Sequence, residues 1–256
     1  MAPNNDVNPS RVVDTQTGKQ TKPWIVSQDY GRYRGALVQS VSITRNQTVE
    51  MLPEFDNPNM ASSTRTYDGS QATIEWAASQ NQDIEAMLMN TNPLYSPMLY
   101  DPSQLAPVEV CFVDYGKNSR TNYASRLLIY GQQDSSSIPE DTKGSMKKSV
   151  GLTFIAEKEI INGQVQYTRF TKGAVNFVTD DDVAFDVNGV GTFPVSTQLV
   201  NNTDQTTTRV LWAKKNGLPV TDTTLYSATA TTFTPTTAPV TGDRWDVFTV
   251  IPSAAP

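Results

Sequence analysis

The residues of this sequence best suited to chemistry are a small number of carboxylates. Asp180-Asp-Asp182, with Asp186 close behind, is the densest acidic cluster. An Asp-rich loop can supply the oxygen ligands of a calcium site. The ligand spacing and the turn glycine of an EF-hand are missing, however, so a solvated acidic turn is the favoured interpretation. We therefore predict no metal site and keep calcium binding as the open alternative for this cluster.

A second pair of carboxylates, Glu157 and Glu159, lies two residues apart on a predicted strand, so both side chains share one face. The two carboxyl groups of a glycosidase stand about 5–9 Å apart, and this pair could imitate them. Lys158 lies between the two glutamates, and alternating charge on a strand surface is the simpler account. We assign no catalytic role to the pair.

The chain contains no histidine and one cysteine, Cys111. The absence of histidine excludes Ser-His-Asp and Cys-His nucleophile systems and the usual zinc sites. Cys111 lies in Val108-Glu-Val-Cys-Phe-Val113, which predicts a buried, inert thiol. No phosphate-binding loop and no G-x-G-x-x-G motif occurs. The sequence therefore predicts no enzyme activity and no cofactor.

Composition narrows the class of protein further. A chain of 256 residues, 38% hydrophobic and 18% charged, is long enough for one large or two modest domains. Its net charge of −6 is the opposite of what a protein that grips nucleic-acid phosphates needs. The first ten residues lack the apolar run of a signal peptide, and no run of 18 apolar residues predicts a membrane span.

The elements that must position these residues begin with two alternating strands, Ala36–Arg45 and Gln71–Ala77. In each strand, apolar side chains alternate with polar ones, which is typical of a sheet with one buried and one wet face. A short helix follows the second strand. Ser79-Gln-Asn-Gln82 has the spacing of a capping box, and Pro93 ends the helix. One apolar stripe on this helix consists of Ile84, Met87 and Leu88.

A long insertion over residues 46–70 separates the two strands. It carries Pro53 and Pro58, which argue against regular structure, so we expect an irregular loop. It also carries apolar side chains that a disordered segment should lack. Folding back as a flap on its own domain would cover them, and so would a contact with another molecule. These side chains are Val49, Met51, Leu52, Phe55 and Met60.

Further strands are predicted along the rest of the chain. The first set comprises residues 108–115, 123–130, 146–160 and 165–170, with a polar loop over 134–144. Asn162-Gly163 is a strong hairpin signal, so we expect the strand at 165–170 to pair back on the one before it. From Gly173 the composition changes, with 14 threonines between Thr203 and Thr241 and no helical period. Strands are predicted there at 184–187, 209–213, 225–230 and 245–251, with a second Asn-Gly turn at 216–217.

These patterns predict a mainly β protein: an antiparallel β-barrel or sandwich with one short helix, followed by a small C-terminal β-sandwich. The expected domains are an N-terminal arm over 1–23, a β-barrel domain over 24–172 with the loop 46–70, and a Thr-rich domain over 173–256.

The order of strand, long projecting segment, strand, short helix and antiparallel strands resembles the tail tube proteins of tailed phages and contractile injection systems. The residues that carry the resemblance are Gly35–Arg45, the segment 46–70, Gly69–Trp76 and Asp83–Met89, within a region of about 24–171. The C-terminal segment, from Val210-Leu-Trp-Ala through Gly242-Asp-Arg-Trp-Asp-Val247, is similar to β-modules that decorate phage structural proteins.

The resemblance implies a virion protein of the tail that assembles with itself into stacked hexameric rings and conducts DNA without binding it specifically. It implies that Val49, Met51, Leu52, Phe55 and Met60 contact the adjacent ring. Sheath, baseplate or terminator proteins are the implied further partners, and no membrane is involved. We also expect the lumen to carry Ser, Thr, Gln, Asp and Glu more often than Lys or Arg, because a basic wall would hold DNA by its phosphates.

Two other functions stay open on the sequence. A capsid decoration or tail-completion protein would share the composition but would not stack into tubes. A carbohydrate-binding or hydrolytic β-module would instead use exposed aromatics such as Tyr95, Tyr100 and Tyr123 as a sugar platform.

Overall fold

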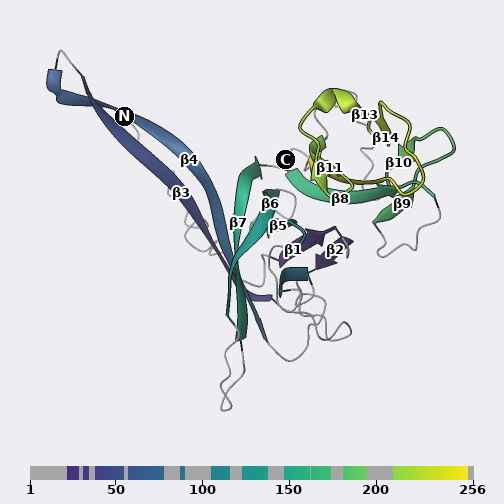
Figure 1. Cartoon of the computed structure of the whole chain (residues 1–256), viewed down its shortest axis with the longest axis horizontal. Coiled ribbons are helices and arrows are strands. Elements are labelled where there is room, and N and C mark those ends of the chain that lie inside the picture. The colour runs from purple at the N-terminus through teal and green to yellow at the C-terminus, as the bar shows by residue number, and fades with distance from the viewer. Residues whose placement is uncertain are drawn as a thin grey trace, which may run out of the picture. The chain divides into compact units, whose positions relative to one another are not determined.

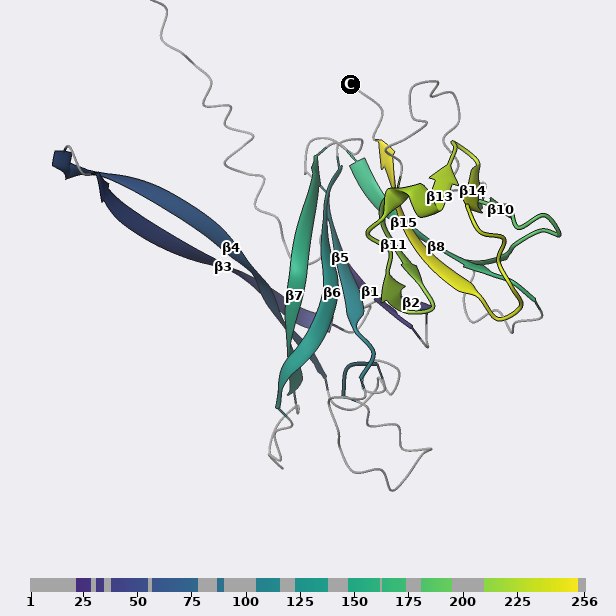
Figure 2. The same cartoon turned by 45° about the horizontal axis from the view of Figure 1, so that its top comes forward.

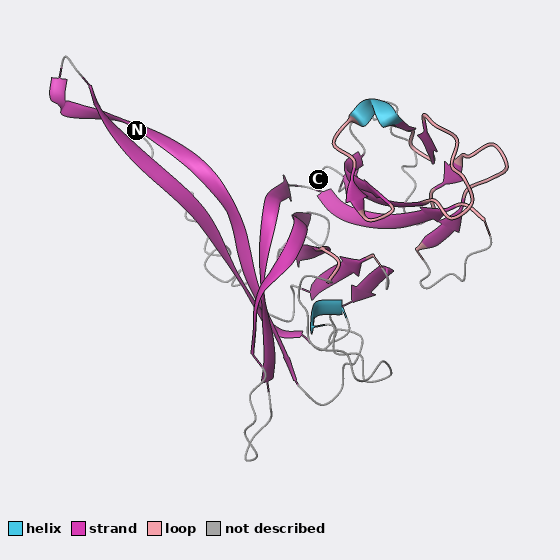
Figure 3. Ribbon diagram, in the orientation of Figure 1, coloured by secondary structure: helices cyan, strands magenta, loops and turns pink. Residues whose placement is uncertain are grey.

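Strands dominate the protein, as the sequence predicts (Figure 3). The computed structural model describes residues 22–28, 31–34, 38–54, 57–77, 87–89, 105–115, 123–137, 147–161, 163–173, 181–194 and 210–252. The chain forms two compact units. The hairpin unit consists of residues 37–109 and 128–158, and the sandwich unit consists of residues 1–36, 110–127 and 159–256.

The strands follow one another along the chain with few other elements among the described residues (Figure 1). They are β1 (Lys22–Ser27), β2 (Gly31–Arg34), β3 (Val38–Glu54), β4 (Asn57–Ala77), β5 (Val108–Tyr115), β6 (Tyr123–Ser137), β7 (Lys147–Ile161), β8 (Gly163–Thr171), β9 (Asp182–Ala184), β10 (Gly191–Thr192), β11 (Val210–Lys215), β12 (Leu218–Pro219), β13 (Tyr226–Ala228), β14 (Thr232–Pro235) and β15 (Arg244–Pro252). A 3₁₀ turn spans Thr223–Leu225.

In the hairpin unit, β4 pairs antiparallel with β3 on one side and with β7 on the other. Side chains of β4 alternate as predicted, and one face is buried while the other is wet. The buried face joins β4 to β7 through directly opposed apolar pairs, Ala72 with Leu152 and Ile74 with Val150. Trp76, fully buried, extends this core along β4.

The described residues of the segment 46–70, which exclude 55–56, are regular, and this corrects the expectation of an irregular loop. They continue β3 and β4, whose ladder runs on to Pro53 opposite Ala61. Proline removes one backbone donor and is excluded only from strands that are paired on both edges. Pro53 lies on β3, an edge strand, and Pro58 lies where β4 has no third strand beside it. The two prolines are therefore compatible with the hairpin.

In the sandwich unit, a five-stranded sheet of order β12-β11-β15-β8-β9 faces a three-stranded sheet of order β10-β14-β13. The Asn-Gly turn at 216–217 joins β11 to β12 as predicted, with φ of 52° at Asn216 and 82° at Gly217. The predicted pairing of β8 with the preceding strand is wrong. β8 instead pairs along its whole length with β15, from Gly163 opposite Pro252 to Thr171 opposite Arg244.

An aromatic cluster joins the two sheets of the sandwich unit. Phe170 of β8 is its centre: its ring stacks on Phe233 at 5.4 Å between centroids and meets Phe193 edge-on at 5.3 Å. Trp245, beside Phe170 on β15, contacts the Phe233 ring at 5.4 Å. Each of these side chains is at most 3% exposed, so the cluster is the core between the sheets.

The opposite face of the β8–β15 pair is covered by β1. Trp24 stacks on Phe248 with 6.3 Å between ring centroids. Next to them, Arg169 donates from Nε to the Asp246 carboxylate at 2.6 Å and from Nη2 to the Ser27 carbonyl at 2.8 Å. Tyr167 donates its hydroxyl to the same Asp246 oxygen at 2.8 Å. Burial, together with the Asp246 carboxylate, raises the pKa of Tyr167 well above its ordinary value, so the hydroxyl keeps its proton.

Helix is scarce in the described part of the chain. Met87–Met89 are helical and buried, within the stretch where a helix is predicted, and the remainder of that stretch lies outside the described residues. None of the described helices is long and apolar enough to cross a bilayer. Cys111 on β5 is buried and forms no disulfide, and its apolar surroundings in the sequence predict this burial.

Replacing Phe170 tests the aromatic cluster as the core of the sandwich unit. Phe170→Ala removes the ring on which Phe185, Phe193 and Phe233 pack, and we expect it to lower the free energy of unfolding by about 3–5 kcal/mol. Urea denaturation followed by tryptophan fluorescence measures the change. Val187→Ala is the control, because Val187 is 93% exposed and its truncation should cost less than about 0.5 kcal/mol. Equal costs for the two variants would contradict the assignment.

Candidate functional site

The ribbon formed by β3 and β4 changes character at a β-bulge. Arg45 lies opposite Ser70, and the next pair is Gln47 with Tyr67, so two residues of β4 stand opposite one of β3. One of the two is Gly69, with φ of 103°, a conformation that glycine adopts freely. A Cβ there would lie 2.7 Å from the Phe154 carbonyl oxygen. The bulge thus needs glycine both for its backbone angle and for its contact with β7.

β7 stops accompanying the ribbon at the same place. Its pairs with β4 run from Ala77 with Lys147 to Ser70 with Phe154. Beyond the bulge, β3 and β4 continue as a two-stranded hairpin, which extends past β7 in both views (Figures 1 and 2). We call this part, residues 47–54 and 57–67, the outer hairpin.

A polar cluster fixes the root of the outer hairpin. Arg45 of β3 makes a two-pronged ion pair with Glu157 of β7, with Nη2 2.6 Å from Oε1 and Nε 2.8 Å from Oε2. Ser70 donates to the same carboxylate at 2.9 Å, and its hydroxyl oxygen lies 2.5 Å from that of Tyr67. The Glu157 side chain is 7% exposed and that of Arg45 is 47% exposed. Three strands are therefore tied together at the point where the third one leaves.

A second feature of the hairpin unit is the wet face of its sheet. Opposed residues across β3, β4 and β7 share that face, and none of the nine in the three central rows is basic. They are Ser40, Glu75 and Ser149, then Ser42, Thr73 and Gly151, then Thr44, Gln71 and Thr153. Asp134 of β6 accepts a hydrogen bond of 2.6 Å from Thr153 and extends this polar face. Lys147 lies beside Ala77 at the end of the ladder and is a basic residue on the same face.

The edge of the sheet is the third feature. β3 is the terminal strand of its sheet, so the backbone groups along its outer edge point away from β4. Such an edge can accept a further strand from another chain. Charged residues are one means by which proteins protect edges from such pairing. In this strand the described exposed side chains from Ser40 to Thr48 are neutral except for Arg45.

The residues predicted to contact another ring fall in or beside the outer hairpin. Val49, Met51 and Leu52 lie on β3 and Met60 lies on β4, whereas Phe55 lies outside the described residues. Their role in an interface stays a prediction. No local sequence pattern indicates the root cluster, because Arg45 and Glu157 are 112 residues apart.

Asp180 lies outside the described residues, and the other acidic residues considered above as ligands or catalysts have partners within the chain. Asp181 pairs with Arg32 at 2.6 Å, and Asp186 accepts the backbone N–H groups of Asn188 and Val190 in a local turn. Glu159 pairs with Arg126 at 3.9 Å. Within the part of the chain that the structure describes, no group of three or more potential ligand side chains is placed to hold a metal ion. Tyr95 and Tyr100 lie outside that part.

The chain matches no protein-family model and no curated protein. Its structure is similar to the anti-feeding prophage baseplate, with 9% identity over 55% of this chain and 92% of that one and a TM-score of 0.39. It is also similar to the SPP1 tail tube, with 13% identity, 56% and 77% coverage and a TM-score of 0.37. A third similar structure is the sheath–tube complex of the PVC extracellular contractile injection system, with 9% identity, 55% and 88% coverage and a TM-score of 0.38.

Replacing Glu157 tests the root cluster. Glu157→Gln removes the charge that holds Arg45, and we expect local destabilisation of about 1 kcal/mol, a modest value because Arg45 is half exposed. Hydrogen exchange of the backbone amides near Gln47 and Tyr67 measures it as faster local opening. Glu159→Gln is the matched control, since its ion pair is long and exposed and should contribute almost nothing. If Glu157→Gln leaves the hydrogen exchange of these backbone amides unchanged, the ion pair does not anchor the hairpin.

Proposed function

We propose that this protein is a structural subunit that assembles with copies of itself into stacked rings, forming the tube of a phage-type tail. The observation that carries the proposal is the outer hairpin: a two-stranded ribbon, anchored at its root by Arg45 and Glu157, that continues past the third strand of its sheet.

An isolated two-stranded hairpin is marginally stable at best in water, because each strand has one neighbour and the ribbon has little apolar area to bury. The root cluster fixes the direction of the outer hairpin but cannot cover its two faces or its open edge. A surface on a neighbouring subunit would cover them, and the open edge of β3 would be closed by the same assembly.

The apolar side chains of the ribbon suit that role. In the proposal, Val49, Met51, Leu52, Phe55 and Met60 pack on the adjacent ring, where burial of each would contribute on the order of 1–3 kcal/mol. Contacts that join unlike surfaces of successive copies generate open-ended filaments, as a tube requires. The number of six subunits in each ring is taken from the resemblance alone.

The polar face of the hairpin unit is proposed to line the lumen. Its central rows are neutral or acidic, with Glu75 and Asp134 as the charged groups. A duplex near such a wall is held by no phosphate contacts and can slide. DNA would thus pass the subunit without specific binding, in keeping with the net charge of −6.

The remaining parts of the proposal follow the expected domain division. Residues 24–172 would build the tube, residues 1–23 would be an arm, and residues 173–256 would form a decorating domain. Sheath, baseplate or terminator proteins would be the other partners in the virion tail. An assembly subunit of this kind needs no catalytic group and no cofactor.

Electron microscopy of the purified protein at high concentration, with its mass in solution, tests the proposal. We expect hollow tubes or stacked rings. Deleting residues 48–68 should leave rings that no longer stack, because the ribbon that reaches the next ring is gone. A monomer that never assembles, whatever the salt or time, would overturn the proposal, and rings that never stack even in the intact protein would favour a decoration or tail-completion protein.

Two double substitutions test the same contacts with less risk of misfolding than the deletion of residues 48–68. Met51→Ser with Leu52→Ser removes two of the proposed contact side chains, and Ser62→Ala with Ser63→Ala changes the residues opposite them on β4. We expect the first variant to raise the concentration needed for stacking by about tenfold or more and the second to leave it unchanged. Equal assembly of the two variants would contradict the assigned contacts.

Chemical labelling tests which face lines the lumen. In Thr73→Cys tubes, the new thiol should react with a small maleimide but far more slowly with a maleimide carrying a large polymer, since the polymer is excluded from the lumen. Thr231→Cys, in an exposed turn of the sandwich unit, should react with both reagents. The native Cys111 is buried and gives little background. Rapid labelling of Thr73→Cys by the large reagent would place the polar face outside.

A further inference from the structure

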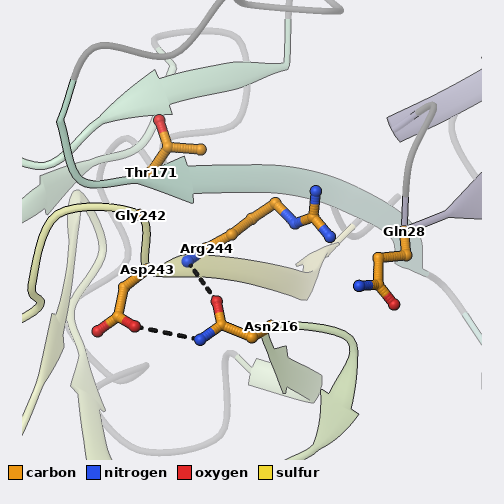
Figure 4. A pocket seen from close by; sticks show the side chains of 6 residues that line it. All are labelled: Gln28, Thr171, Asn216, Gly242, Asp243 and Arg244. Atoms are coloured by element: carbon orange, nitrogen blue, oxygen red, sulfur yellow. Dashed lines mark hydrogen bonds between the residues drawn. The ribbon is translucent and has the colours of Figure 1, made fainter.

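The sandwich unit contains a pocket beside the end of β1. Its volume is about 320 Å³, close to the lower limit of the range of small-molecule sites, roughly 300–1,000 Å³. Figure 4 shows the side chains that line it, and they come from the turn after β1, the end of β8, the β11–β12 turn and the start of β15. They are Gln28, Thr171, Asn216, Gly242, Asp243 and Arg244.

The pocket arises where the cover provided by β1 ends. On this face of the β8–β15 pair, the Trp24 ring stacks on Phe248, and the Ser27 carbonyl accepts a hydrogen bond from Arg169. The next cross-strand pair is Arg244 with Thr171, and β1 has already ended at Ser27. Arg169 is neutralised by Asp246 directly opposite, whereas Arg244 has a threonine opposite and receives no such charge.

Two polar groups that line the pocket are therefore unused. Arg244 Nε and Thr171 Oγ1 are buried and have no hydrogen-bond partner among the described residues, and Thr171 is 2% exposed. In Figure 4 the Arg244 guanidinium extends toward the side of the pocket that carries Gln28. Buried polar atoms are nearly always paired, so an unpaired guanidinium nitrogen and hydroxyl in one pocket indicate a missing ligand.

The carboxylate that lines the pocket, that of Asp243, already has three donors. Lys215 Nζ, Asn216 Nδ2 and the Val240 N–H each donate to it at 3.1 Å. Burial acts to raise the pKa of Asp243, but the hydrogen bonds from Asn216, Lys215 and the Val240 backbone outweigh it, so the pKa is lowered and the group stays ionised. The charge of Arg244 thus remains available to a ligand.

We propose that this pocket binds a small polyhydroxy carboxylate of the size of one acidic monosaccharide. Arg244 would hold the carboxylate through charge-assisted hydrogen bonds, for which the planar guanidinium is suited. The Gln28 amide and the Thr171 hydroxyl can each donate and accept, which matches sugar hydroxyls. Gly242 leaves the pocket wall open, since a Cβ there would meet nothing within 4 Å.

Ligand-observed NMR titration of the full chain with glucuronate tests the proposal, and it reports binding to monomers and assemblies alike. We expect saturable binding with Kd on the order of 1 mM, as suits a ligand of this size. Glucose, which lacks the carboxylate, should bind at least about tenfold more weakly. Failure here leaves the proposed tube function untouched, because no step of the assay requires assembly.

Variants locate the binding. Arg244→Gln should weaken glucuronate binding by about tenfold to a hundredfold, and Gln28→Ala by a few-fold. Arg126→Gln, a change of the same kind away from the pocket, should leave binding unchanged. Equal binding by wild type and Arg244→Gln, or no saturable binding at all, would overturn the proposal. Acetate binding as tightly as glucuronate would overturn the assignment to a sugar, because a carboxylate alone would then suffice.

Discussion

The structure depends on the requirement that each backbone donor and acceptor of a strand find a partner. The sandwich unit meets it internally: β8 is flanked by β15 and β9, and β15 by β11 and β8, so its central strands have both edges paired. In the hairpin unit, β4 has both edges paired only up to Ser70, and the outer edge of β3 is unpaired in this sheet. Past that residue two strands share one ladder, and their outer edges face away from each other. Backbone hydrogen bonds at the strand edges are thus more complete in the sandwich unit than in the hairpin unit. This difference is the physical reason to expect a neighbouring subunit at the outer hairpin.

Two ion pairs of the chain serve different purposes. Arg169 and Asp246 are both almost fully buried, and Tyr167 and Ser27 share their hydrogen bonds. Removal of either partner would leave an uncompensated buried charge, so this pair fixes which residues of β8 and β15 face each other. The ion pair of Arg45 and Glu157 is more exposed to water, so removing one partner costs less free energy than in the buried pair. Its two parallel hydrogen bonds instead fix the orientation of β3 relative to β7 beside the bulge at Gly69 of β4.

Local patterns in the sequence predicted the local features correctly. Val108–Tyr115 alternates and is bounded by turn residues, and β5 has those bounds. Asn216-Gly217 predicted a tight turn because both residues tolerate positive φ, and both adopt it. Non-local features were missed. Asn162-Gly163 gives the same signal, yet β8 pairs with a strand more than 70 residues away. Pro53 and Pro58 indicate a break in regular structure, because nothing in a sequence reveals which strand edges stay unpaired.

In the candidate site, too, the local features can be predicted from the sequence and the non-local ones cannot. The alternation of Gln71, Thr73 and Glu75 with Ala72, Ile74 and Trp76 predicted a wet and a buried face, and the structure has both. The residues that anchor the hairpin or line the pocket come from distant segments: Arg45 pairs with Glu157, and Gln28 lines the same pocket as Arg244. In the sequence, Glu157 forms a pattern with its neighbour Glu159, but its partner in the structure is Arg45 of β3.

The pairing of β8 with β15 also sets an order of events during synthesis. β8 leaves the ribosome about 80 residues before β15, and until then its edge and the charge of Arg169 lack the partners they have in the finished protein. Closing so long a loop is slow compared with forming a local hairpin. Nascent chains that stop short of Arg244 therefore expose Phe170 and Tyr167 to other chains, and the synthesis of β15 is the event that commits β8 to its final pairing.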